Sequence, residues 1–113
     1  MKKSNINFEI ELDENSVPEK INWNATDATD GTQETKSISI SLWDHEERNS
    51  MRIDLWTKDM PVTDMKRFYI DCLGGMAQSV LNATGDEFMA QEMNDLCEKM
   101  VAHVEKEMRE QGQ

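Results

Sequence analysis

The spacing of apolar residues changes once along this chain, and that change limits its possible folds more than any other feature. Between Ile6 and Leu55, apolar residues recur at every second position in short runs, which is the period of a strand with one buried face. From Met65 onward they recur at steps of three and four residues, the period of an amphipathic helix. Strands first and helices last predict an α+β domain.

The first alternating segments predict one hairpin. Pairing Ile10 with Ile21 and Phe8 with Trp23 places every large apolar side chain on one face, so this register is self-consistent. The segment that follows, residues 24–36, has no large apolar residue and predicts an exposed, mobile polar loop.

The second hairpin has the clearest alternation. Leu42 is expected to face Met51 and Ile38 to face Leu55, with the apolar side chains on one face. The opposite face is polar with a tryptophan at each end, and its side chains are Ser39, Ser41, Trp43, Arg52, Asp54 and Trp56. Aromatic groups on a polar face often anchor protein contacts, so both tryptophans, with Arg52 and Asp54 between them, are candidate partner-binding residues. The alternatives are tryptophans covered by their own neighbours and a structural ion pair of Asp54 with Arg52 or Lys58.

Two helices are expected after the strands. The first opens with Thr63 as N-cap and ends at Gly85, which suits a left-handed helix end. The second runs to about Glu110, and its methionine-rich stripe includes Met89 and Met93. Methionine is flexible and polarizable, so these two residues are further candidates for partner binding, with a plain core face as the alternative.

These elements predict a two-layer α+β fold in which a four-stranded antiparallel sheet is followed by two helices, in the order β-β-β-β-α-α. The whole chain, residues 1–113, is expected to form a single domain. Gly74 and Gly75 lie inside the first helix, where glycine is unfavourable, and predict a bend or a close backbone contact.

Charge limits the partners. The chain has 23 acidic and 12 basic residues and a net charge of −11, so its surface repels phosphate backbones and anionic lipid headgroups. Neither nucleic acid nor membrane is an expected partner.

No apolar run follows Lys2 and Lys3, so we expect no secretory signal and a cytoplasmic location. Cys72 and Cys97 lie far apart within helical patterns and are expected to be buried thiols.

No set of residues predicts catalysis. A neutral-pH active site usually needs a nucleophile beside a base, or two carboxylates in contrasting environments, and the sequence has no such pattern. His45 and His103 have no partners at zinc-type spacing. We therefore expect no enzyme activity, no cofactor and no metal. Stoichiometric zinc in the purified protein would contradict this expectation.

Four segments carry a family resemblance: residues 12–23, 42–44, 52–60 and 65–68. Together they resemble the gliding motility protein GldC family over nearly the whole chain. The resemblance implies a small protein of gliding, Bacteroidetes-type bacteria with no catalytic residues. It implies a role in supporting gliding motility and leaves the biochemical act open. Together with the tryptophans of the polar face and the net charge of −11, it leads us to expect a non-enzymatic cytoplasmic accessory or assembly factor that binds protein, with motility or secretion components as partners.

A second likeness concerns the order of elements alone, which is also that of the SecB-type export chaperone. It implies an alternative function, a SecB-like holdase in which an apolar groove with an acidic rim binds unfolded client proteins. Fold order by itself does not establish function. Because the expected sheet has two open edges, we also expect self-association, most simply as a two-fold homodimer or otherwise as a higher homo-oligomer.

Overall fold

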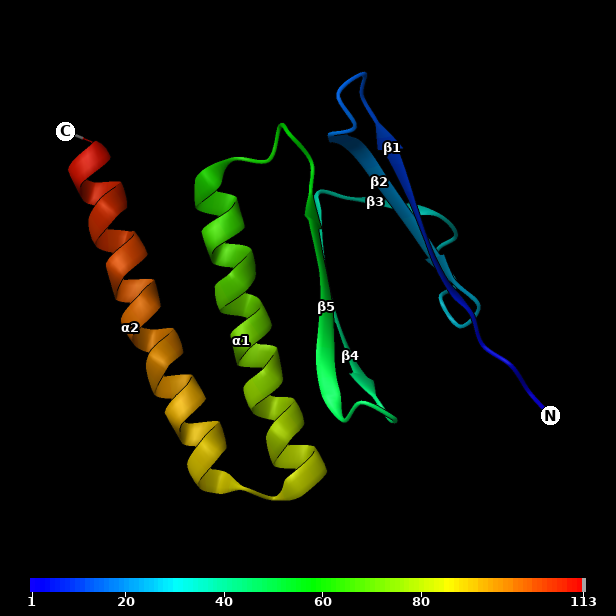
Figure 1. The fold of residues 1–113 in the computed structure, drawn as a ribbon. Helices are drawn as coiled ribbons and strands as arrows, with labels where there is room; N and C mark the ends of the chain where they lie inside the picture. Colours follow the sequence, from blue (N-terminus) through cyan, green and yellow to red (C-terminus); the bar gives the residue numbers. More distant parts are fainter. Residues whose placement is uncertain (113) are drawn as a thin grey trace. The chain divides into compact units, whose positions relative to one another are not determined.

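The computed structural model describes residues 1–112 and divides the chain into two compact units. Met1–Met60 contains all the strands, and the unit that begins at Pro61 contains both helices (Figure 1). Antiparallel strands followed by two helices confirm the α+β class. Within residues 1–112, neither helix is long and apolar enough to cross a membrane. That residues 1–113 form a single domain, and that the helices pack as a layer on a sheet, stay predictions.

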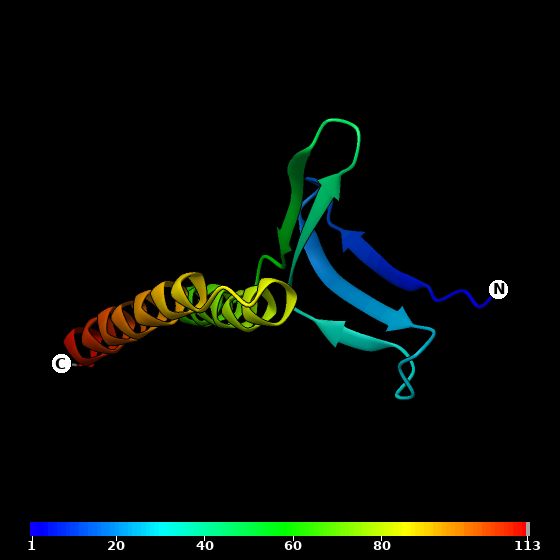
Figure 2. The ribbon, with the colours of Figure 1, turned by 90° about the horizontal axis from the view of Figure 1, so that it is seen from below.

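The strands form two antiparallel sheets instead of one. They are β1 (Ile6–Leu12), β2 (Pro18–Ala25), β3 (Gln33–Thr35), β4 (Ser37–Asp44) and β5 (Asn49–Trp56). The first three make a sheet in the order β1-β2-β3, and β4 and β5 make a two-stranded sheet (Figure 2). The prediction of one four-stranded sheet is therefore wrong.

Both predicted hairpin registers are confirmed. In the first, Phe8 pairs with Trp23 and Ile10 with Ile21. In the second, every pair from Ser37 with Trp56 to Asp44 with Asn49 follows the expected alignment. A slip of one residue would move all the apolar side chains to the other face, so the alternation specifies the register strongly.

The segment predicted as a polar loop contains β3, which is the reason that one sheet does not form. Its Thr35 pairs with Ile21 and its Gln33 with Trp23, so β3 occupies the edge of β2 that lies away from β1. Ladder hydrogen bonds come from the backbone and need no apolar side chain. After Lys36 the chain enters β4, and β5 is its one partner among the described strands.

The two sheets are joined where the chain leaves β3 and β5. Thr57 is 1% exposed, and its backbone N–H donates to the Lys36 carbonyl at 2.8 Å. The N–H of Lys58 donates to the Pro18 carbonyl at 2.9 Å. Ile21, at 0% exposed, and Ile38, at 9%, are the buried apolar residues of this unit. Its core is therefore small.

The helical unit is an antiparallel pair, with α1 (Val62–Thr84) beside α2 (Glu87–Gln111) (Figure 1). The predicted Thr63 cap is wrong, because Pro61 precedes the first turn and no side chain caps it. Proline is tolerated at a helix start because its missing N–H would have no partner there. The left-handed end at Gly85 is confirmed, with φ of 73°. Asp86 caps α2 by accepting the Met89 N–H at 3.0 Å.

Small residues lie where the helices meet. Ala77 of α1 and Ala90 of α2 are 1% and 5% exposed. A Cβ added at Gly74 would lie 3.9 Å from the Cys97 sulfur, so this glycine faces α2, whereas α1 continues through Gly75 without a break. The spacing between packed helices depends on the side chains at the contact. Of the two explanations predicted for the glycine pair, a close approach therefore applies to Gly74.

Candidate protein-binding surface

The polar face of the β4–β5 hairpin brings four of the six predicted site residues together. Alternation puts the odd residues of β4 and the even residues of β5 on this face. We call it the tryptophan face, and it comprises Ser37, Ser39, Ser41, Trp43, Ser50, Arg52, Asp54 and Trp56. Trp43, which pairs with Ser50, and Trp56, which pairs with Ser37, lie at its opposite ends, as predicted.

Hydrogen bonds fix the centre of the tryptophan face. The Ser39 hydroxyl donates to Asp54 Oδ1 at 2.7 Å, and Arg52 Nη2 donates to the same oxygen at 3.1 Å. Arg52 also donates to the hydroxyls of Ser39 and Ser41. The Arg52 guanidinium and then the Ser39 hydroxyl hold the pKa of the Asp54 carboxyl below its usual range. The predicted pair of Asp54 with Arg52 therefore exists, and the alternative pair with Lys58 does not.

The tryptophans at the two ends of this network are exposed. Trp43 is 66% exposed and Trp56 is 46% exposed. The Ser50 and Ser37 residues opposite them have short side chains that cover little of a ring. Two large aromatic surfaces thus flank a neutral, hydrogen-bonded centre, and both tryptophan and arginine are residue types that are enriched at protein interfaces.

The loop after Trp43 is held by its own backbone. The Asp44 carboxylate accepts the N–H groups of Glu46 at 3.1 Å and Glu47 at 2.7 Å. The Arg48 N–H donates to the Asp44 carbonyl at 2.9 Å, with Arg48 at φ of 55°. Aspartate favours such turns because its side chain bonds the backbone that follows. The loop therefore fixes the end of β4 that carries Trp43.

The other side of the hairpin is apolar, and its exposure rises toward the loop. We call it the aliphatic face, and it comprises Ile38, Ile40, Leu42, Met51, Ile53 and Leu55. Ile38 is 9% exposed, whereas Leu42 is 49% and Met51 is 60% exposed. The hairpin is thus buried where it joins the rest of its unit and uncovered at its far end.

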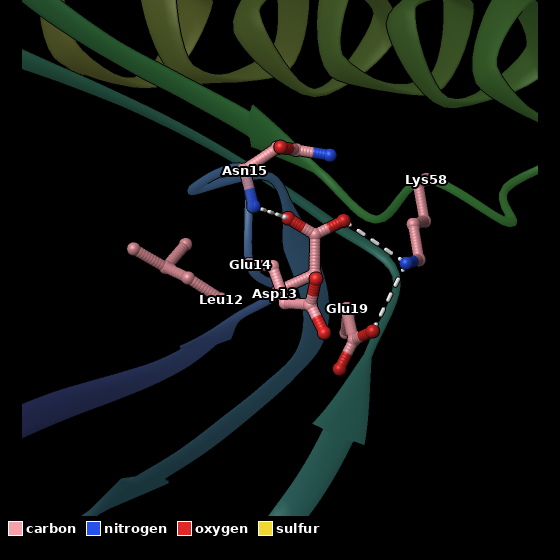
Figure 3. Close-up of a pocket in the computed structure, with 6 residues that line it drawn as sticks. All are labelled: Leu12, Asp13, Glu14, Asn15, Glu19 and Lys58. Carbon is pink, nitrogen blue, oxygen red and sulfur yellow. Dashed lines mark hydrogen bonds and ion pairs between the residues drawn. The ribbon is translucent and has the colours of Figure 1, made fainter.

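A cluster of charged side chains connects the first hairpin to the segment that follows β5 (Figure 3). The sequence analysis did not predict this cluster. Lys58 Nζ lies 3.0 Å from Asp13 Oδ2 and 2.9 Å from Glu19 Oε1, and both carboxylates point toward it. Asp13 Oδ1 also accepts the N–H groups of Asn15 at 2.8 Å and Val17 at 3.0 Å. We call these residues the Lys58 junction.

The Lys58 junction lines an open hollow of about 470 Å³. The backbone N–H of Val17 and then the Lys58 ammonium lower the pKa of the Asp13 carboxyl, while Glu19 and then Asp13 raise the pKa of Lys58. The two carboxylates of Asp13 and Glu19 thus share the one Lys58 ammonium. The Asp13-Glu14-Asn15-Ser16 turn could have predicted the backbone contacts of Asp13, but nothing local predicts its bond to Lys58.

Met89 and Met93 lie on α2 and are not part of the tryptophan face. Met89 is 45% exposed in the first turn, and Met93 is half-buried. Met93 lines a shallow hollow of about 330 Å³ with Leu96 and Lys99.

A larger hollow, of about 500 Å³, lies between the two helices. We call it the helical groove, and its lining is Thr63, Asp64, Arg67, Ile70, Asp71, Val101, Val104, Glu105 and Met108. Three carboxylates and four apolar side chains contribute to this lining. The sequence predicted a groove of this composition only through the likeness to an export chaperone.

Metal ligands do not converge in the part of the chain that the structure describes. Within residues 1–112, no three His, Cys, Asp or Glu side chains lie together so that they could hold a metal ion. His103 instead lies 3.4 Å from Glu107 on the same helix, and Glu107 also pairs with Lys66 at 2.8 Å.

Comparison with known proteins yields one family. The family described as "Gliding motility-associated protein GldC-like" matches residues 18–106. This range includes the whole β4–β5 hairpin and nearly all of the helical pair. Neither the curated proteins nor the solved structures gave a match.

Proposed function

Because the chain belongs to the gliding motility-associated GldC-like family, we propose that it is a non-enzymatic, cytoplasmic accessory or assembly factor of gliding motility that binds protein. The observation that carries this proposal is the pair of exposed tryptophans at the two ends of the tryptophan face. Tryptophan and arginine dominate interface hot spots. The hydrogen bonds of Arg52 also reduce the freedom that it would lose on binding.

The partner in this proposal is a protein component of the motility or secretion machinery. The contact surface of this partner has a groove or pocket that accepts an aromatic ring, and basic residues surround that groove. The net charge of −11 supports these basic residues, because it attracts positive surfaces and repels nucleic acid.

Affinity capture from a gliding bacterium tests this proposal. The baits are the wild type, Trp43→Ser, Trp56→Ser and, as a matched control, Leu42→Ser. Leu42 neighbours Trp43 and is 49% exposed, but it lies on the opposite face. We expect the wild type and the control to recover the same motility or secretion component and both tryptophan variants to lose it. Recovery of no such component by the wild type, or equal recovery by all four baits, would contradict the proposal.

The helical groove favours a second candidate function, the SecB-like holdase. Ile70, Val101 and Met108 offer apolar surface, and Asp64 and Asp71 place carboxylates beside it. Such a lining suits unfolded segments with apolar and basic residues. Suppression of the aggregation of unrelated unfolded proteins, abolished by Val101→Asp, would support this function. A dedicated accessory factor would protect few such proteins or none.

A further inference from the structure

We propose that the outer edge of β5 pairs with the same edge of a second copy of this chain, antiparallel, about a two-fold axis at Ile53. Within residues 1–112, β5 has β4 as its one strand partner, so its other edge carries backbone N–H and C=O groups without a strand beside them. An open edge is a template for another strand. A two-stranded sheet is also marginally stable by itself, and further strands stabilise it.

Charge distinguishes β5 from the other strands with open edges. Its segment, Asn49–Trp56, contains one arginine and one aspartate and is neutral. The segment of β1 contains Glu9 and Glu11 without a basic residue, that of β3 contains Glu34, and that of β4 ends at Asp44. In a chain of net charge −11, two copies meet with least repulsion along a neutral strand.

The side chains of β5 select one register. Alternation admits only registers that keep the aliphatic faces of both copies on the same side. Two such registers pair most of the strand, one centred on Arg52 and one on Ile53. The first brings Arg52 opposite the partner's Arg52, and like charges opposite each other are destabilising. The second brings Arg52 opposite the partner's Asp54.

The register centred on Ile53 is also complementary on the aliphatic face. Ile53 meets the partner's Ile53, and Met51 meets the partner's Leu55. Met51 is 60% exposed and Ile53 is 44% exposed in the single chain, so pairing covers apolar surface that the hairpin leaves uncovered. The two hairpins then form a four-stranded sheet from two chains.

This sheet would also enlarge the tryptophan face. Trp43 pairs with Ser50 in its own hairpin, and Ser50 would lie opposite the partner's Trp56. Neighbouring strands lie about 4.8 Å apart, so the two tryptophans would stand on one row at a separation of about 10 Å. The dimer goes beyond the proposed function and does not rest on it.

Reversed charges test the dimer. Light scattering of the wild type is expected to give twice the chain mass of 13.1 kDa. Arg52→Asp and Asp54→Arg each place like charges opposite each other, so each variant alone is expected to give 13.1 kDa. Mixed in equal amounts, one chain offers two acids and the other two bases, so the dimer mass should return. The double variant R52D/D54R should also dimerise.

Mixing Arg52→Asp with Asp54→Arg separates a loss of pairing from a loss of folding, in case the single variants are less stable. Each single change also removes the Arg52–Asp54 pair within the chain, so far-UV circular dichroism must show that the variant is folded. Two unfolded proteins would not regain the dimer mass on mixing. A wild type that stays at 13.1 kDa, single variants that still associate, or a folded mixture that stays monomeric would each overturn the proposal.

A cysteine at the axis tests the register separately. Ile53→Cys places two thiols directly opposite each other, at a Cα separation of about 4.5–5.5 Å that suits a disulfide. The matched control is Met51→Cys, whose opposite residue is the partner's Leu55. Mild oxidation should cross-link the first variant through residue 53, as mapped by mass spectrometry, and leave the control unlinked. Equal cross-linking of both variants would refute this register.

Discussion

Ile21 should be the apolar residue on which the strand unit depends most. Its side chain is 0% exposed, and it pairs with Ile10 on one side and Thr35 on the other. Ile6 provides a matched control in the neighbouring strand, since it is the same residue type at 67% exposed. The pair Ile21→Ala and Ile6→Ala therefore differs mainly in burial.

The expected losses follow from the carbon atoms removed. Isoleucine to alanine removes three carbons, each contributing about 0.8 kcal/mol when buried, which gives about 2.5 kcal/mol at Ile21 before any cavity forms. An unfilled cavity raises the loss further, within a range of about 2–5 kcal/mol. At Ile6 about a third of the surface is covered, so the same change should cost about 0.8 kcal/mol.

Urea unfolding followed by tryptophan fluorescence measures both losses. All three tryptophans lie in the strand unit, so their emission reports on that unit. With an m-value of about 2 kcal/mol/M, Ile21→Ala should lower the midpoint by about 1.2 M or more and Ile6→Ala by about 0.4 M. Equal shifts for the two variants would show that Ile21 does not lie in the core of this unit.

Three further predictions concern other parts of the chain. Trp23→Ser should lower the melting temperature more than Trp43→Ser, because Trp23 is half-buried and Trp43 is 66% exposed; thermal melts compare them. Gly75→Ala should stabilise the helices by about 1 kcal/mol, measured by circular dichroism, because a Cβ there meets no atom within 4 Å. Hydrogen bonds, first from the Val17 amide, lower the pKa of Asp13, so its stabilisation is present above the unfolded pKa and is lost as pH falls through the folded one. Urea midpoints should therefore fall less steeply at acidic pH in Asp13→Asn.

The hairpin registers could be predicted because side chains alone determine them. Phe8 and Trp23, or Leu42 and Met51, share a face in only one alignment of their strands. Strand β3 could not be predicted in this way, because Gln33–Thr35 has no large apolar side chain and its pairing comes from the backbone. The sequence therefore indicates which side chains lie together within a hairpin more reliably than it indicates how many strands a sheet has.

Ion pairs between residues far apart in the sequence could not be predicted from the spacing of residues either. Asp13 and Lys58 are 45 positions apart, and each lies in a polar segment with other charged residues nearby. Their ion pair follows from the path by which the chain leaves β5 and passes the β1–β2 turn, where the Lys58 N–H meets the Pro18 carbonyl. Partner choice among exposed charges depends on that path, which no local spacing encodes.

Alternation also predicts which side chains share a face without predicting what covers them. Ile38 and Ile53 both lie on the aliphatic face, yet Ile38 is 9% exposed and Ile53 is 44% exposed. The difference arises because Ile38 is next to Ser37 and the buried junction of the two sheets, whereas Ile53 is farther along the hairpin. An apolar pattern that continues beyond the core of its own unit leaves apolar surface exposed, and a contiguous surface of this kind is suited to a partner. At Ile53 that surface adjoins the outer edge of β5, and in the proposed dimer Arg52 and Asp54 of this neutral strand lie opposite Asp54 and Arg52 of the second copy, so charge and apolar surface favour the same pairing.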